Sequence, residues 1–330
     1  MSVPDTRSSI PFVLDAAQLS ALCEKAGLEL EAYLISLVQS LPKLALVPIS
    51  NFHVTAIGVG VSGHAFLGVN LEFHGLPLSN SVHAEQFMVA NAIHHGEASL
   101  KLIVVSHAPC GHCRQFLQEL RSAGDIRVVI ADGNLESRTL HEWLPHRFGP
   151  QDLLDDDFPL LMESRHHGLE QAKDQIANGS AGVLDTEIDR PSLQVSVSEQ
   201  VSDSLNRPKV IDSSEVDLDE LIEAAVSAAN SAYSPYSNSP SGLAFRTKQG
   251  MVFAGSYLES AAYNPSLPPL QNAIVAMISK GSHHTYSDIT EVILAEIKEA
   301  PVQYRGTIKM ILEMIAPQAS FMTVSLTKKP

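Results

Sequence analysis

A strand–helix–strand pattern between residues 100 and 132 constrains the fold more than any other feature of this chain. The run "LKLIVVSH", residues 100–107, is continuously apolar, as is typical of a strand covered on both faces. The stretch "CGHCRQFLQEL" has apolar residues at helical spacing, and "DIRVVIAD", residues 125–132, is a second strand. Two strands joined by one helix at this length run parallel. The pattern therefore predicts an α/β domain with helices on both faces of its sheet.

The preceding residues complete such a domain. Residues 14–40 predict two helices, with Cys23 on their apolar stripe as a core residue. In residues 51–73, two β-prone runs flank a Ser-Gly turn and indicate a hairpin. A helix from about residue 83 to residue 95 follows, and Gly96 ends it. We expect a three-layer α/β/α core with a mixed sheet, preceded by N-terminal helices.

Composition narrows the class of protein. A chain of 330 residues favours two domains, and its formal net charge of −15 disfavours a nucleic-acid-binding groove, which normally needs a basic face. No apolar run is long enough to span a bilayer, and the N-terminus lacks a hydrophobic signal core. The three cysteines do not make a paired framework, so a reducing compartment is expected. We expect a cytosolic protein with no membrane or nucleic-acid partner.

Two titratable residues stand at a predicted helix start. In "SNSVHAEQFMVANAI", residues 79–93, His83 and Glu85 flank a small alanine just before an apolar helical face. A histidine there is ordinarily a surface or core residue, and an early glutamate is favourable at the positive end of the helix dipole. This stretch alone does not decide between structure and chemistry.

A second helix start carries two thiols. "APCGHCRQFLQEL" places Cys110 and Cys113 three residues apart, so both can grip one metal ion. A helix N-terminus favours the thiolate, which is the ligating form. The alternative is a thioredoxin-like redox pair, which would bind no metal.

Together the two helix starts offer one nitrogen and two sulfur ligands, from His83, Cys110 and Cys113, a set that suits zinc. The other cysteine belongs to a different predicted helix, so the site keeps an open position, as catalytic zinc sites do. Glu85 is then placed to handle the protons of a reacting water. His-x-Glu followed by Pro-Cys-x-x-Cys is the pattern of zinc deaminases.

The segments "HAEQF" and "APCGHCRQFLQE" resemble the cytidine deaminase family, specifically its homodimeric two-core type from bacteria and plants. The resemblance covers nearly the whole chain, including "LPHRFGPQDLL". It implies zinc-dependent hydrolysis of cytidine and deoxycytidine to uridine and deoxyuridine, with release of ammonia, as in pyrimidine salvage. It also implies one zinc ion per chain, held by His83, Cys110 and Cys113, with Glu85 as the catalytic residue, and a homodimer.

The resemblance assigns four further residues. Asn70 and Glu72, two apart on a predicted strand, would bind the ribose 3′-hydroxyl; the alternative is that both are edge-strand surface residues. A carboxylate there would repel the 3′-phosphate of a polynucleotide. Phe52 would pack on the pyrimidine ring, unless it is an ordinary core residue. Arg114 would hydrogen-bond a ligating thiolate, unless it is a surface arginine.

The C-terminal half repeats the first half without its chemistry. "SPYSNSPSGLAF", residues 234–245, aligns with residues 47–58, and "PPLQNAIVAMI", residues 268–278, aligns with residues 82–92. The aligned replacements are Ser239 for Phe52, Tyr257 for Asn70, Pro269 for His83, Gln271 for Glu85 and Val302 for Cys110. A proline offers no ligand and a glutamine amide is no general base, so we expect zinc in the N-terminal core only.

The expected organisation is an N-terminal helical segment (1–45), a catalytic core (46–170), a linker (171–215) and a degenerate core (216–330). Three other functions remain possible on the residues alone. A polynucleotide cytosine deaminase shares the zinc pattern, but the acidic balance and the Asn70/Glu72 pair disfavour it. A scaffold with structural zinc would have no use for Glu85. The redox pair requires no metal.

Overall fold

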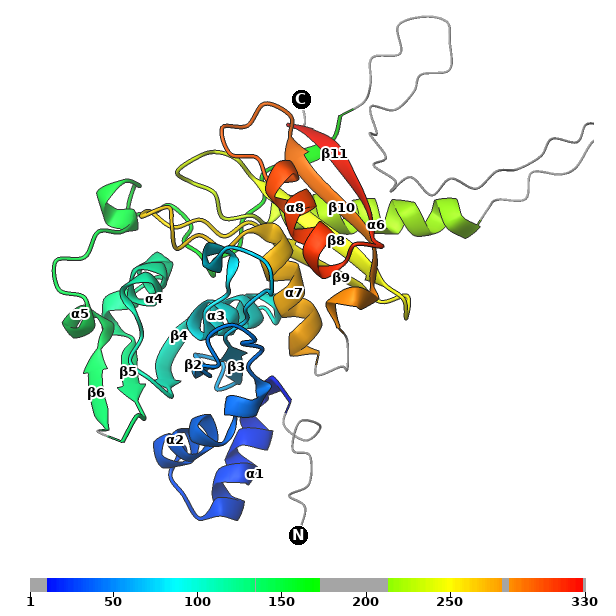
Figure 1. The fold of residues 1–330 in the computed structure, drawn as a ribbon. Helices are drawn as coiled ribbons and strands as arrows, with labels where there is room; N and C mark the ends of the chain where they lie inside the picture. Colours follow the sequence, from blue (N-terminus) through cyan, green and yellow to red (C-terminus); the bar gives the residue numbers. More distant parts are fainter. Residues whose placement is uncertain (1–10, 134, 173–212, 281–284, 329–330) are drawn as a thin grey trace, which may run out of the picture.

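The computed structural model describes residues 11–133, 135–172, 213–280 and 285–328, and it contains two mixed sheets (Figure 1). Most of the expected linker lies outside these described residues. None of the described helices combines the length and apolarity that crossing a bilayer requires.

The first sheet has six strands in the order β1-β3-β2-β4-β5-β6. They are β1 (Val13–Leu14), β2 (Thr55–Gly60), β3 (Ala65–Val69), β4 (Leu100–Val105), β5 (Arg127–Ile130) and β6 (Glu136–Thr139). As predicted, β2 and β3 form an antiparallel hairpin and β4 runs parallel to β5. The hairpin turn uses Gly63 at φ 85°, a left-handed conformation that glycine adopts without strain.

Helices cover both faces of this sheet, which confirms the three-layer prediction. They are α1 (Ala16–Ala26), α2 (Leu30–Ser40), α3 (Ala84–His94), α4 (Gly111–Phe116) and α5 (Leu140–Trp143). On one face, the Thr55 hydroxyl donates to the carbonyl of Val38 in α2 at 2.7 Å. On the other face, Gly68 of β3 lets α3 approach so closely that a Cβ there would lie 2.1 Å from the Ala84 carbonyl oxygen.

The second sheet has five strands in the order β7-β11-β10-β8-β9, with β10 and β11 parallel. Its elements are β7 (Leu169–Gln171), α6 (Ser213–Asn230), β8 (Ser241–Thr247), β9 (Val252–Ser256), α7 (Pro269–Ser279), β10 (Ile289–Ile297), α8 (Arg305–Ile315) and β11 (Ser320–Lys328). Gly242 faces α6, and Gly255 faces α7 on the opposite side of the sheet. The second core is therefore also a three-layer sandwich, as the repeat predicts.

The hydrogen bonds that precede α3 and α7 show which residues of the two helices are equivalent, and they differ from the expected sequence alignment. Leu71 bridges Val82 just before α3, and Leu258 bridges Leu267 just before α7. The residues that cap the two helices are accordingly His83 and Pro268. The expected pairing of Pro269 with His83 and of Gln271 with Glu85 is thus wrong by one position.

The physical reason is the length of the connection. Eleven positions separate the bridged residues in the first core, and nine separate them in the second, by their numbers. Leu270 therefore stands where Glu85 stands in the first core. The helix starts likewise pair Cys110 with Tyr304 rather than with Val302. The conclusion that this half lacks the zinc ligands is unaffected, because Pro268 offers no ligand atom and Tyr304 offers no thiolate.

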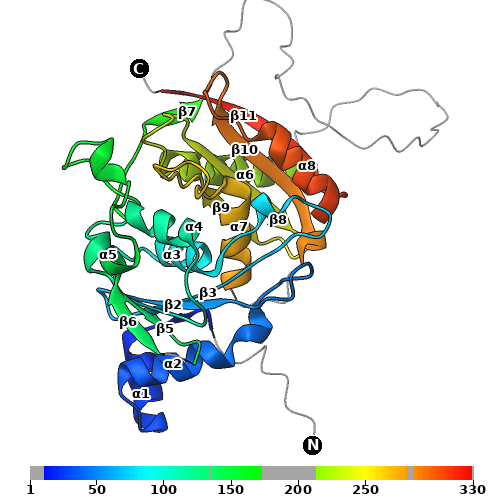
Figure 2. The same ribbon diagram turned by 60° about the vertical axis from the view of Figure 1, so that its left-hand side comes forward.

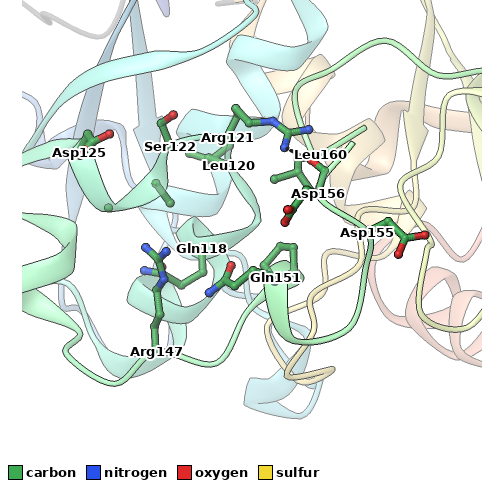
Figure 3. Close-up of a pocket in the computed structure, with 13 residues that line it drawn as sticks. Gln118, Leu120, Arg121, Ser122, Asp125, Arg147, Gln151, Asp155, Asp156 and Leu160 are labelled. Atoms are coloured by element: carbon green, nitrogen blue, oxygen red, sulfur yellow. Dashed lines mark hydrogen bonds between the residues drawn. The ribbon is translucent and has the colours of Figure 1, made fainter. Parts of the chain in front are cut away.

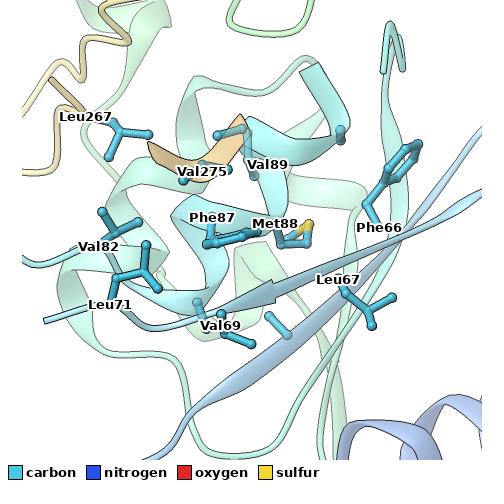
Figure 4. Close-up of a cluster of buried hydrophobic side chains, with 14 of the residues drawn as sticks. Phe66, Leu67, Val69, Leu71, Val82, Phe87, Met88, Val89, Leu267 and Val275 are labelled. Carbon is cyan, nitrogen blue, oxygen red and sulfur yellow. The ribbon is translucent and has the colours of Figure 1, made fainter. Parts of the chain in front are cut away.

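The two cores share one hydrophobic interior. Helices α3 and α7 pack against each other between the sheets (Figure 2). One buried cluster contains residues of both cores, and Figure 4 draws Leu267 and Val275 of the second core among residues of α3 and β3 of the first. The second core is therefore joined to the first by buried side chains and not only by the chain.

Candidate active site

His83 stands at the N-terminus of α3, where its position is fixed through the backbone. Its N–H donates to Oε1 of Gln86 at 3.1 Å, an arrangement that satisfies one of the free amides of the helix start. The close contact of α3 with Gly68 fixes the helix against the sheet. The imidazole then projects toward the start of α4, which carries both thiols.

The three predicted ligands meet in space. Nδ1 of His83 lies 3.5 Å from Sγ of Cys110 and 3.3 Å from Sγ of Cys113, and the two sulfurs are 3.6 Å apart. Tetrahedral zinc, with usual bond lengths, would place two sulfurs about 3.8 Å apart and a nitrogen about 3.6 Å from a sulfur. The donor atoms therefore already have the separations that a tetrahedral zinc ion requires.

Hydrogen bonding between the two thiols shifts their pKa values in opposite directions. Hydrogen bonding between the two sulfurs lowers the pKa of Cys110 to about 3, which favours its thiolate. The hydrogen bond with that thiolate, together with burial, raises the pKa of Cys113. The Cys110 thiolate also raises the pKa of His83. One sulfur is thus already in the ligating form, and a divalent cation favours the loss of the second proton.

Glu85 lies directly against this set. Its side chain is only 3 % exposed, and its Oε2 accepts from Sγ of Cys113 at 3.1 Å. Burial raises the pKa of this carboxyl, since the charged form loses its hydration. A buried carboxyl with a raised pKa beside a metal site is suited to taking up and returning a proton.

His112 also belongs to this group, although the His-x-Glu and Cys-x-x-Cys pattern does not include it. One ligand atom from each of His83, Cys110, His112 and Cys113 lies within 4.8 Å of the others. The His112 ring stacks on the His83 ring, with 4.6 Å between the centroids. Its Nε2 lies 3.2 Å from the carbonyl oxygen of Asn264, a residue of the second core.

The predicted ribose-binding residues hold one loop. Glu72 is 8 % exposed, and its Oε2 accepts from the amides of Ile49 and Ser50. Asn70 accepts from the Val54 amide at 2.9 Å and donates to the Phe52 carbonyl at 2.9 Å. Both follow the end of β3 instead of lying within the strand, yet both reach residues 49–54. They are therefore not surface polar residues of an edge strand.

The same hydrogen bonds set the charge of Glu72. Its burial opposes ionisation, but hydrogen bonds from the Ser50 hydroxyl and from the loop amides hold the pKa of this carboxyl below its usual range. The loop therefore presents an ionised carboxylate, whose Oε2 accepts from two loop amides.

Phe52 and Arg114 frame the site. The Phe52 side chain is 52 % exposed and leans on the His107 ring, with 4.7 Å between centroids, so it is not a core residue. Arg114 donates from Nε to the Pro109 carbonyl at 2.8 Å and from Nη1 to the Trp143 carbonyl at 3.0 Å. These two bonds hold the turn before Cys110.

Two hollows lie near these residues. One of about 700 Å³ opens beside Glu72, between Asn51 and His53 of the first core and Tyr286 of the second. The other, of about 250 Å³, lies beyond the end of α4, and its lining includes Arg147 and three aspartates (Figure 3). Neither is lined by a thiol or by His83.

The second core shows no comparable donor set within the described ranges. The position of Asn70 is taken by Tyr257, whose ring packs on Tyr304 with 5.0 Å between centroids. The Tyr257 hydroxyl donates to Oε1 of Glu259 at 3.3 Å. Aromatic side chains therefore fill the space that the first core leaves open, and the zinc site belongs to the first core alone.

The sequence could have indicated the contact between Gln86 and His83 but not the contact between His112 and Asn264. Gln86 follows His83 by three residues, which is the spacing of a capping box and could have revealed its role. The contact between His112 and Asn264 joins backbone and side chain across the two cores, and no local pattern indicates it.

Comparisons with known proteins agree with this site. The model of the cytidine and deoxycytidylate deaminase zinc-binding region matches residues 28–131, and a second model of that description matches residues 140–309. Cytidine deaminase 1 of Arabidopsis thaliana is 38 % identical over 322 residues, covering 94 % of this chain and 96 % of the relative. Cytidine deaminase 6 of Arabidopsis thaliana is 37 % identical over 294 residues, covering 86 % and 88 %.

Among solved structures, a cytidine deaminase from Burkholderia pseudomallei is 28 % identical, covering 36 % of this chain and 98 % of its own, with a TM-score of 0.33. The identity to the plant enzymes over almost the full length of both chains is the stronger finding. This chain belongs to the cytidine deaminase family.

Proposed function

We propose that this chain hydrolyses cytidine and deoxycytidine to uridine and deoxyuridine, releasing ammonia, with Glu85 as the proton carrier. The observation that supports this most directly is the buried Glu85 carboxyl against a donor set with zinc spacing. A structural zinc site has no need of such a group, and a thioredoxin-like pair has no need of His83.

The chemistry divides between the ion and the chain. Zinc, when bound by His83, Cys110 and Cys113, lowers the pKa of water and so supplies a nucleophile near neutral pH. Glu85 accepts the proton that the water loses and donates it to ring N3. The oxygen adds to C4, Glu85 takes the remaining proton of the resulting hydroxyl and passes it to the amine, and the C4–N4 bond breaks as the C4 carbonyl forms. The net reaction consumes one water and forms ammonia.

The loop contacts favour a free nucleoside. Oε2 of Glu72 is occupied by two loop amides, which leaves Oε1 to accept from a ribose hydroxyl. The second core supports this assignment, since the equivalent oxygen of Glu259 accepts from the Tyr257 hydroxyl. We assign Asn70 to the same hydroxyl and exposed Phe52 to the face of the pyrimidine. A 3′-phosphate at this point would meet the negative charge of Glu72.

Glu85→Gln tests the assignment. The amide keeps the size of the side chain but cannot carry the proton, so kcat for cytidine should fall by at least about a hundredfold, with zinc content unchanged. Glu97→Gln alters another buried carboxyl of the first core and should leave kcat unchanged. Near-normal turnover by Glu85→Gln would refute the proposal, as would deamination of a single-stranded oligonucleotide in preference to cytidine.

We also infer, from the family resemblance, that the chain is a cytosolic homodimer. All three cysteines are free, which suits a reducing compartment. Exposed apolar side chains near the site, such as Leu46 at 43 % and Ile49 at 42 %, provide surface for a partner. Light scattering coupled to gel filtration should give twice the chain mass of 35.6 kDa, and a monomer mass would exclude the dimer.

A further inference from the structure

A loop of the second core reaches the metal ligands of the first. Residues 261–265 lie between β9 and α7, and two of their backbone carbonyls point at the zinc site. The carbonyl of Pro265 accepts from Nε2 of Gln86 at 2.8 Å. The carbonyl of Asn264 lies 3.2 Å from Nε2 of His112. The catalytically silent core thus contacts the site without any of its own ligand residues.

The two residues that contact this loop, Gln86 and His112, both also contact His83. Gln86 is 1 % exposed, and its Oε1 accepts from the His83 amide while its Nε2 donates to Pro265. The His112 ring stacks on the His83 imidazole while its Nε2 faces Asn264. The ligand is therefore fixed from its backbone side by Gln86 and from its ring face by His112, and both of these residues rest on the 261–265 loop.

A buried carboxylate holds that loop in place. Glu119, in the turn that follows α4, has no exposed surface. Its Oε1 accepts from the Ala261 amide at 2.7 Å, and its Oε2 accepts from the hydroxyls of Tyr233 at 2.9 Å and Tyr236 at 2.6 Å. Three donors of the second core thus converge on one carboxylate of the first. Such a group is costly to bury unless its acceptors are used, as they are here.

We propose that the silent core is a positioning element for the metal: the 261–265 loop, held by Glu119, fixes the orientation of His83 through Gln86 and His112. Partners that orient a ligating histidine strengthen metal binding, because a free ring must lose its rotational freedom when the ion binds. The second core thereby contributes to zinc retention although it binds no zinc. This inference rests on the zinc site of the proposed function but not on turnover.

The test measures zinc release from the purified, zinc-loaded full chain into a chromogenic chelator, well below the unfolding transition. Glu119→Leu removes all three acceptor contacts and should release zinc at least about tenfold faster. Glu119→Gln should release at the wild-type rate, since its amide oxygen can still accept from Ala261 while the tyrosine hydroxyls turn to accept from its NH₂. Gln86→Leu cuts the link between the loop and His83 and should release as fast as Glu119→Leu.

A matched control separates positioning from general loosening. Glu296, 5 % exposed, is another buried carboxylate of the second core, and it accepts from the Tyr304 amide, away from the loop. Glu296→Leu should lose stability but keep the wild-type release rate. The Glu119→Leu/Gln86→Leu double variant should release no faster than the faster single variant, because both cut one path.

Wild-type release by both Glu119→Leu and Gln86→Leu would overturn the proposal, as would equal acceleration by Glu296→Leu. If Glu119→Leu does not fold, Gln86→Leu decides alone: faster release supports the proposal and unchanged release overturns it. Because zinc is measured directly, a chain that retains zinc but fails to deaminate cytidine would refute the proposed function and leave this inference standing.

Discussion

Glu72 and Glu259 are equivalent carboxylates that hold equivalent loops in the two cores. Comparing them distinguishes the structural role of Glu72 from its role in substrate binding. Oε2 of Glu72 accepts from the Ile49 and Ser50 amides at 3.0 and 2.9 Å. Oε2 of Glu259 accepts from the equivalent amides at 2.9 and 3.1 Å. The second core has no chemistry to perform, so its carboxylate serves the loop alone. Glu72 should therefore do the same work for the loop, in addition to binding substrate.

The magnitude follows from these bonds. Each carboxylate accepts from two amides, and a hydrogen bond to a charged group is worth about 1.5–3 kcal/mol when buried. When the carboxylate is removed, water can hydrogen-bond to the loop amides and recover part of this free energy. We therefore take about 1–2 kcal/mol as the net loss for each hydrogen bond. Glu72→Ala and Glu259→Ala should each lower the free energy of unfolding by about 2–4 kcal/mol. Urea unfolding followed by circular dichroism measures both.

The Glu72→Ala and Glu259→Ala variants should differ in their activity on nucleosides. Glu72→Ala also removes the acceptor for the ribose 3′-hydroxyl, so its kcat/KM for cytidine should fall about 10- to 100-fold more than its kcat/KM for 3′-deoxycytidine. Displacement of Phe52 by the loosened loop affects both nucleosides and cancels in this ratio. Glu259→Ala should leave the ratio unchanged. Equal losses on the two nucleosides, or full stability of Glu259→Ala, would refute the reasoning.

Three further outcomes are expected. Gly68→Ala should lower the free energy of unfolding in urea by about 3 kcal/mol, because its Cβ would lie 2.1 Å from the Ala84 carbonyl oxygen. Chelator-treated protein should be alkylated by iodoacetamide at exposed Cys110, whereas zinc-loaded protein should resist, as read by mass spectrometry. Burial raises the pKa of Glu119, so its stabilising contribution is complete below about pH 4.3 and falls as pH rises through the folded pKa; Glu119→Gln should flatten this decline in urea titrations.

The first core was predictable because its signals are local. The apolar runs of β4 and β5 and the helical spacing between them give a parallel pair by chain length alone. The ligand set was equally accessible, since His83, Cys110 and Cys113 each stand at a helix start and share the chemistry of one ion. The one-residue error at α7 arose where no such anchor exists. The apolar residues of α7 can be aligned with those of α3 in two ways that differ by one residue. Only the backbone bridge between Leu258 and Leu267 distinguishes the two alignments.

Contacts between the cores could not be inferred from spacing. Gln86 and Pro265 are 179 residues apart, and the acceptor is a backbone carbonyl, which every residue type carries. Glu119 gives no better signal, because a glutamate at a helix end is ordinarily solvated. Its burial becomes apparent only when Tyr233 and Tyr236 are placed against it.

The duplication distinguishes residues that hold the backbone from residues that do chemistry. The second core retains the carboxylate of Glu259 and a left-handed Asn238, at φ 52° against 54° for Asn51, so these features support the loop itself. It has lost the ligand and the proton carrier, whose places are taken by Pro268 and Leu270. Tyr257 replaces Asn70, and its hydroxyl donates to Oε1 of Glu259. In the second core, the Tyr257 hydroxyl thus provides Glu259 with a hydrogen bond that a substrate hydroxyl would provide to Glu72. The second core can therefore be stable without substrate and support the active core.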